Sequence, residues 1–293
     1  MSTFILLTIT GLGLGAMYFL IASGLSLIYG LMGVLNFAHG TFLTVSAYAL
    51  WFTESKLGGL SVTPRFLVAS VVGLVVATVF AALIELVFIR PLYGRHIEQV
   101  LVTVGLALAI TALITAIWGN DARVVAVPRW LGETTTVAGA NIPNDRWLEI
   151  ITAVAVLFGL ELFLRRTRYG LIVRAGVENR AMVTALGIDV TRAFTLVFAI
   201  GGLAAGIAGV LSSVYFTTVD PQHGTSLVIF AFIVVVIGGL GSLRGTALAA
   251  IVVGLVQQYA NYYASSGLGD LSVVLLLGAV LLIRPRGFSG SFA

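Results

Sequence analysis

Long apolar runs dominate this chain and predict its elements before any single residue is considered. The first residue with a fixed charge is Glu54, so the first 53 residues carry none. Because about 20 apolar residues cross the hydrocarbon core as a helix, this stretch has room for two crossings. Later runs at 198–215 and 227–241 are continuously apolar and do not alternate, unlike the strands of a membrane barrel. The pattern predicts an all-α, polytopic membrane protein.

We expect one transmembrane domain over residues 1–293, with eight or nine spanning helices. The spans are expected at about residues 4–29, 33–52, 66–89, 97–118, 147–164, 192–216, 226–240, 246–264 and 270–284. The span at 33–52 contains Asn36 and His39, so a broken or re-entrant segment is the alternative there.

Composition agrees with this class. Hydrophobic residues make up 59% of the chain, charged residues make up 10%, and the mean hydropathy is +1.09. Soluble domains contain about 25% charged residues. The 34 glycines suit closely packed membrane helices. With no cysteine, the chain has no disulfide, thiol nucleophile or thiolate metal site.

Charge is concentrated in one island between two apolar spans. Nine of the Asp, Glu, Lys and Arg residues lie between Glu161 and Arg192. Since Lys and Arg resist translocation, this loop at about 165–191 is expected on the cytoplasmic side. Nine alternating crossings then put 11 basic residues inside and 5 outside, with the N-terminus outside and the C-terminus cytoplasmic. The arginines thus fit a topological role, and we expect no nucleic-acid partner. The outer loop at about 119–146 is the other sizeable soluble segment.

The island has the features of a short surface helix. Gly170 permits a change of direction, and a helix is expected over 171–186, ended by Gly187. Its inward positions are Ile172, Ala175, Val183 and Leu186, and its outward positions are Arg174, Glu178 and Arg180. Local features alone fit a docking element and a solvated loop that only sets topology equally well.

A short motif occurs twice. His39-Gly40-Thr41 returns as His223-Gly224-Thr225, each time before an apolar run. The expected topology puts the two copies on opposite sides of the membrane, as an inverted repeat would, although chance similarity is the alternative.

Few titratable side chains are available for ion coupling. Glu85 precedes Arg90, and Glu161 precedes Arg165, so helix-end pairs are the simpler interpretation than proton relays. His39 has no obvious partner, and a packing role is more common for such a histidine than proton transfer.

The chain shows no energy source or catalytic centre of its own. Its one lysine, Lys56, has no Walker A context, so any ATP hydrolysis belongs to another subunit. No zincin-type or nucleophile-elbow motif occurs, and we do not expect an enzyme.

Several segments together resemble one family. Residues 174–181 and 185–188, RAGVENRA and ALGI, resemble the cytoplasmic coupling loop of bacterial ABC importer permeases. More narrowly, the chain is similar to the LivH-type permeases of branched-chain amino acid importers. The further matching pieces are GVLNFAHG at 33–40, GGLGSLRG at 238–245 and RPRG at 284–287.

The resemblance implies a subunit of an ATP-driven importer in the bacterial cytoplasmic membrane. Its implied partners are a LivM-like permease subunit, two ABC ATPase subunits, an extracytoplasmic amino-acid-binding protein and membrane lipid. This chain would bind no cofactor, because ATP and Mg would be bound by the ATPase subunits. The implied coupling residues are Arg174, Glu178, Arg180, Ala181, Ala185, Gly187 and Ile188. The loop departs from the broad importer pattern at 178–181, where Glu-Asn-Arg-Ala replaces Glu-Ala-Ala.

The candidates for lining or gating the pathway are Asn36, Phe37, His39 and Gly40. A buried amide side chain can form hydrogen bonds with backbone groups at a helix break or with a zwitterionic solute. The alternative is that these residues only pack helices. The sequence predicts import of leucine, isoleucine and valine. Permeases for urea, amides or other amino acids, and an ion-coupled secondary carrier, are the alternatives. Whether the permease pairs with itself or with a different chain is left open.

Overall fold

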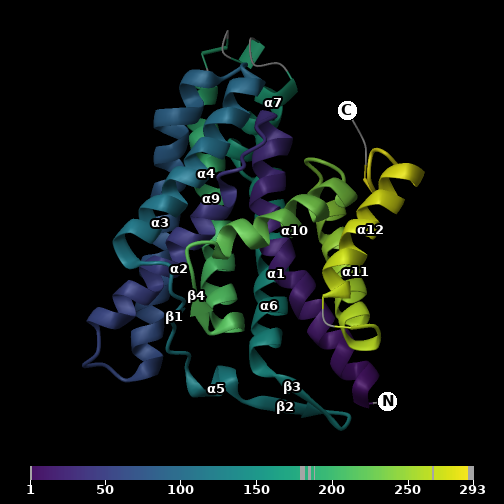
Figure 1. Ribbon diagram of the computed structural model, residues 1–293. Helices are drawn as coiled ribbons and strands as arrows, with labels where there is room; N and C mark the ends of the chain where they lie inside the picture. Colours follow the sequence, from purple (N-terminus) through teal and green to yellow (C-terminus); the bar gives the residue numbers. More distant parts are fainter. Residues whose placement is uncertain (1, 179–181, 184–185, 188, 266, 290–293) are drawn as a thin grey trace.

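A computed structural model of the chain describes residues 2–178, 182–183, 186–187, 189–265 and 267–289, and it is a helical bundle (Figure 1). The major helices are α1 (Ser2–Met32), α2 (His39–Lys56), α3 (Val62–Ile84), α4 (His96–Trp118), α6 (Asn144–Arg166), α9 (Val190–Phe216), α10 (His223–Gly238), α11 (Leu243–Tyr263) and α12 (Leu268–Ile283). The shorter elements are η1 (Glu85–Ile89), η2 (Arg90–Leu92), β1 (Arg123–Val124), α5 (Arg129–Gly132), β2 (Thr134–Val137), β3 (Ala140–Pro143), α7 (Arg168–Glu178) and β4 (Thr218–Val219).

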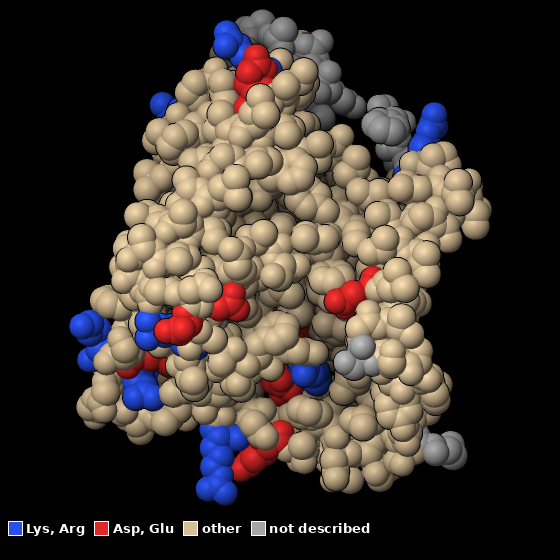
Figure 2. Space-filling view, in the orientation of Figure 1, with Lys and Arg blue, Asp and Glu red and all other residues tan. Residues whose placement is uncertain are grey.

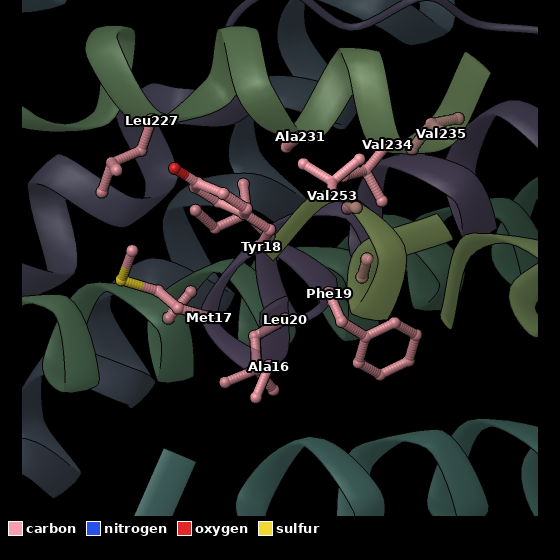
Figure 3. Packing of buried hydrophobic residues seen from close by; sticks show 14 of the residues in the cluster. Ala16, Met17, Tyr18, Phe19, Leu20, Leu227, Ala231, Val234, Val235 and Val253 are labelled. Atoms are coloured by element: carbon pink, nitrogen blue, oxygen red, sulfur yellow. The ribbon is translucent and has the colours of Figure 1, made fainter. Parts of the chain in front are cut away.

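Helices α1 and α9 form the centre of the bundle. Both are apolar on all sides, and they bury more of their surface within the chain than α3, α4 and α6 do. In Figure 3, Tyr18 of α1 points towards α10, which carries Leu227 and Ala231, whereas Met17 and Leu20 point away from that helix. The peripheral helices expose leucines such as Leu108 on α4, so their outer faces suit lipid or another apolar subunit.

Two helices begin near the middle of the bundle rather than at its ends (Figure 1). Residues 33–38 leave α1 without forming helix, and α2 starts at His39. Residues 217–222 leave α9 with only the short strand β4, and α10 starts at His223. The broken segment considered for 33–52 is therefore present, and a second break of the same kind lies before α10.

The two breaks belong to similar halves of the fold. In one half a long helix, α1, is followed by a break, α2 and α3. In the other half α9 is followed by a break, α10 and α11. Helix α1 packs against α11, α9 packs against α3, and α2 packs against α10. This reciprocal packing supports the repeat suggested by the His-Gly-Thr motif. The two copies, however, lie together inside the bundle, not on opposite sides as expected.

The last three helices differ from a simple series of spans. Helix α10 has 16 residues and bends by 118° into α11. At about 1.5 Å per residue, α10 reaches about 24 Å, short of a hydrocarbon core of about 30 Å. The expected separate span at 226–240 is thus not a full-length helix. Within the described residues, five helices are long and apolar enough to cross a membrane alone, and up to six spans result if the bent pair counts as one.

The segment 119–146 forms a small cap at the end of the bundle opposite α7 (Figure 1). Strand β1 pairs with β4, and β2 pairs with β3, in both cases antiparallel. Val125 and Leu131 bury their side chains against the bundle. Figure 2 shows charged side chains near both ends of this face, with a broad uncharged region between them. This distribution is typical of a chain whose middle lies in lipid.

Candidate functional site

The break before α2 is built by a buried asparagine. The Asn36 side chain is fully buried, and its Oδ1 accepts a hydrogen bond of 3.1 Å from the Ala38 amide. The Asn36 carbonyl accepts from the His39 amide at 3.2 Å. Asparagine favours such turns because its side chain replaces a backbone acceptor. Asn36 therefore satisfies backbone groups that the break would otherwise leave unpaired inside the bundle.

His39 contacts α1 rather than another titratable group. Its ring is fully buried, and Nε2 lies 3.1 Å from the Ile21 carbonyl. The ring also meets Phe42 edge-on, with centroids 5.5 Å apart. Among the described contacts this is a packing arrangement, which is the simpler of the two roles considered for His39.

Phe37 is the predicted pathway residue that faces open space. Its side chain is 37% exposed and stacks on Phe232 of α10, with ring centroids 4.9 Å apart. The two rings form part of an apolar groove of about 440 Å³, lined also by α4 residues, by Thr225 and by Leu277 of α12. A groove of this size and polarity can hold an aliphatic side chain.

Helix α10 supplies groups that the sequence interpretation did not assign. His223 mirrors His39, and its Nε2 lies 2.9 Å from the Ser212 hydroxyl on α9. The Gly224 amide donates to Thr44 Oγ1 of α2 at 3.0 Å, which joins the first turns of the two helices. The repeated His-Gly-Thr motif was the signal that could have identified this contact.

The charged loop begins with α7. Helix α6 ends at Arg166, Thr167 is extended, and its hydroxyl accepts from the Gly170 amide at 3.0 Å, which caps α7. The change of direction therefore lies at Thr167, and the expected bend at Gly170 is wrong. The structure describes α7 over Arg168–Glu178, and residues 182–183 are also helical, within the helix expected over 171–186.

Of the predicted coupling residues, Arg174 and Gly187 are exposed. The Arg174 side chain is exposed, as expected. Val183 is buried as expected, but Leu186 is 70% exposed, so its expected inward orientation is wrong. Gly187 is exposed in a turn and has a φ of 78°, a conformation that favours glycine. Only the backbone of Glu178 is described. Arg180, Ala181, Ala185 and Ile188 lie outside the described residues.

The two acidic residues near helix ends have different partners. Glu85 forms the expected ion pair with Arg90, at 3.3 Å. Glu161 instead pairs with Arg244 at the start of α11, at 2.5 Å, so the expected partner Arg165 is wrong. The structure thus links α6 to α11 through residues that are 83 positions apart.

Residues 7–284 match the protein family described as "Branched-chain amino acid transport system / permease component". The chain belongs to this family. It is 30% identical to the high-affinity branched-chain amino acid transport system permease protein BraD of Pseudomonas aeruginosa, over 96% of this chain and 94% of that protein. The corresponding permease protein LivH of Escherichia coli K12 is 29% identical over 96% and 93%.

The chain is also similar to a protein named for another cargo. The fructose import permease protein FruF of Bifidobacterium longum is 28% identical, over 85% of this chain and 69% of that protein. No solved structure matches the chain significantly. The family match and the apolar helices show that the chain is a multi-pass permease component of a transport system.

Proposed function

We propose that this chain is a permease subunit of an ATP-driven importer for branched-chain amino acids in the bacterial cytoplasmic membrane. The observation that carries the proposal is the family match over residues 7–284, together with two relatives named for this cargo that align along nearly the whole chain. The chain would form half of the translocation pathway, and separate ATPase subunits would bind ATP and Mg.

We place the loop at about 165–191 in the cytoplasm and the cap at 119–146 outside. The distribution of basic residues supports this orientation, with 11 in the inside segments and 5 in the outside segments. It puts the N-terminus outside and the C-terminus inside. In Figure 1 the beginning of α1 lies near the cap and the end of α12 lies towards the end of α7, as this orientation requires. The broken segments would complete eight or nine transmembrane helices, of which an odd number cross the whole membrane because the termini lie on opposite sides.

The ATPase would dock on the cytoplasmic loop. The exposure of Arg174 and Gly187 supports this role, because both are available to a partner. The proposed contact set is the one predicted from the sequence: Arg174, Glu178, Arg180, Ala181, Ala185, Gly187 and Ile188. The cap would be available to an extracytoplasmic binding protein.

A second permease subunit would complete the pathway. We propose a LivM-like chain as the partner. Of the four predicted pathway residues, Phe37 would line the route, whereas Asn36, His39 and Gly40 would hold the break that presents it. The apolar groove beside Phe37 suits the side chains of leucine, isoleucine and valine better than the hydroxyl groups of a sugar.

Transport by the reconstituted complex tests the function. Proteoliposomes would contain this chain with its encoded neighbours, and uptake of labelled leucine would be measured with ATP inside and the binding protein outside. A parallel sample would lack the ATPase subunits. Excess valine, isoleucine, fructose or urea would compete for the labelled substrate.

The outcomes separate the alternatives. We expect leucine uptake only in the complete system, with competition by isoleucine and valine but not by fructose or urea. Stimulated ATP hydrolysis without leucine uptake would support an ATP-driven importer but would show that it carries a different solute. Uptake by this chain alone would overturn the ATP-driven function and favour a secondary carrier.

A further inference from the structure

A fully buried carboxylate lies where α3 ends, close to the start of α9. Glu85 has no exposed surface, and its carboxylate accepts hydrogen bonds from the Tyr93 hydroxyl and from Arg90 at 3.3 and 3.4 Å. Arg90 Nη2 also donates to the Thr195 hydroxyl on α9 at 2.6 Å. We call these four residues, Glu85, Arg90, Tyr93 and Thr195, the Glu85 cluster.

The Glu85 cluster joins two segments that are distant in sequence. Three of its residues lie between the end of α3 and the start of α4, and the fourth lies in the second turn of α9. Thr195 accepts from Arg90 and donates to the Thr191 carbonyl at 3.1 Å, so both hydroxyl functions are used. A hydrogen-bonded charge network of this kind fixes the relative position of the two segments more narrowly than apolar contact does.

The cluster also contacts the proposed coupling loop through apolar side chains. Tyr93 meets Phe194 edge-on, with centroids 5.7 Å apart. Phe194 packs in one cluster with Val183 and Val190, which lie in the C-terminal part of the charged loop. Ala175 of α7 and Met32 at the end of α1 pack against the same cluster. Movement of the loop would therefore act on Phe194 and Tyr93, in addition to the contacts that α7 makes with α6, α9 and α1.

The backbone at Glu85 departs from regular helix. Residues Glu85–Ile89 form a π-helical turn, and Arg90–Leu92 follow as a 3₁₀ turn. Such turns are rare within helices and are often found at functional positions. At this turn the Glu85 carboxylate lies inside the bundle. An apolar side chain at the same position would cost less desolvation energy. A purely packing role does not account for this charge.

We propose that the Glu85 cluster transmits movement of the cytoplasmic loop to α3 and α9, so that its four residues couple ATP hydrolysis to transport. This inference rests on the proposed function. The Arg90 side chain is 36% exposed, so its contact with Thr195 can be exchanged for water, whereas Glu85 stays buried. The cluster would thus have a closed state, with α9 held to α3, and an open state in which only the Glu85–Arg90–Tyr93 contacts persist.

The four residues act as positioning residues and need not touch the solute. Loss of their contacts should affect how many solute molecules are imported for each ATP hydrolysed. A loss of stability alone would instead lower transport and hydrolysis together, in proportion to the amount of intact complex.

Two conservative variants test this in the complete reconstituted complex. Thr195→Val removes the acceptor for Arg90 but keeps the shape of the side chain, and the freed guanidinium group can reach water. Tyr93→Phe removes the hydroxyl and keeps the ring against Phe194. The matched control is Glu161→Gln, which breaks the ion pair between α6 and α11 away from the cluster.

The measured quantity is labelled leucine imported per ATP hydrolysed, with thermal unfolding of each purified complex recorded in parallel. We expect both cluster variants to lower this ratio by about fivefold or more, the lower end of typical coupling between sites. The control should keep the wild-type ratio. The double variant should lower the ratio less than the two single effects combined, because both act through one network.

An unchanged ratio in both cluster variants would overturn the proposal, whatever happens to stability. A fall of similar size in the Glu161→Gln control would also overturn it, since the effect would not be specific to the cluster. A wild-type complex without ATP-driven transport would refute the proposed function itself, which is a separate and earlier result of the same experiment.

Discussion

Gly40 and Gly224 lie against each other at the first turns of α2 and α10. A Cβ atom added to Gly40 would lie 2.5 Å from the Gly224 carbonyl oxygen, and one added to Gly224 would meet the Gly40 carbonyl oxygen. Neither helix can therefore carry a side chain at this crossing without moving. The two broken helices of the repeat are in direct backbone contact.

Gly40→Ala should destabilise the protein and lower transport. The new methyl group would overlap the backbone of α10, and overpacking of this kind costs about 1–3 kcal/mol. Thermal unfolding in detergent and leucine uptake would measure the two effects. Gly159→Ala on α6 is the control, because no described atom lies within 4 Å of its added Cβ. Equal stability of the two variants would contradict the close contact.

Gly187→Val should weaken the association of the ATPase or its coupling, and should leave membrane insertion intact. The φ of 78° costs a residue with a side chain about 1–2 kcal/mol, and a β-branched residue tolerates it poorly. Co-purification of the ATPase and uptake would report the change. Gly187→Asn is the matched control, since asparagine adopts this conformation more readily. Normal assembly and uptake in Gly187→Val would count against a docking role for the turn.

Asn36→Leu should reduce transport without releasing the ATPase. Leucine cannot accept the hydrogen bond from the Ala38 amide, and a buried unpaired donor costs about 1–3 kcal/mol. Uptake and ATPase co-purification would be compared with those of Asn36→Ser, which retains an acceptor oxygen. If Asn36→Leu transports as well as the wild type, the break does not depend on this side chain.

Arg146→Gln should be the most damaging single change of charge outside the Glu85 cluster. Arg146 lies 3.3 Å from both Asp145 and Glu149 and stacks over Tyr215, with 3.6 Å between Cζ and the ring centroid. Its removal leaves the buried Glu149 carboxylate without a positive partner, at a cost of about 3–5 kcal/mol. Thermal unfolding would measure this loss.

Two comparisons test that explanation. Glu161→Gln removes an ion pair whose Arg244 side chain is 64% exposed, and exposed pairs contribute about 0–1 kcal/mol. The double variant Arg146→Gln/Glu149→Gln should recover part of the stability, because the more deeply buried of the two acidic side chains no longer needs a positive partner. A double variant less stable than Arg146→Gln would contradict the electrostatic explanation.

Features that depend on neighbouring residues were predictable from the sequence. Long apolar runs predicted the helices, because every backbone group in lipid must be paired internally. The left-handed Gly187 and the break near Asn36 also follow from the residues in the segment itself. Asp189 caps α9 by accepting from the Thr191 amide at 3.0 Å, which is a contact between near neighbours in the sequence.

Features that depend on distant residues were not predictable in this way. Arg244 competes successfully for Glu161 because α6 and α11 meet in space, which spacing along one helix cannot reveal. The pairing of Phe37 with Phe232 has the same origin. Leu186 is 70% exposed and lies in a turn with Gly187, so helical spacing from Ile172 does not set its orientation.

The reciprocal packing of the two halves has a consequence for alternating access, in which a transporter exchanges a state open to one side of the membrane for a state open to the other. Each half contains a long helix, a break and a helix that starts at a His-Gly-Thr motif, and the two halves enter the bundle from opposite ends. A shape that one half adopts is therefore available to the other by the same local geometry. If the two halves exchanged conformations, a molecule open to one side of the membrane would become open to the other. The contact between Gly40 and Gly224 would stay in place during this exchange.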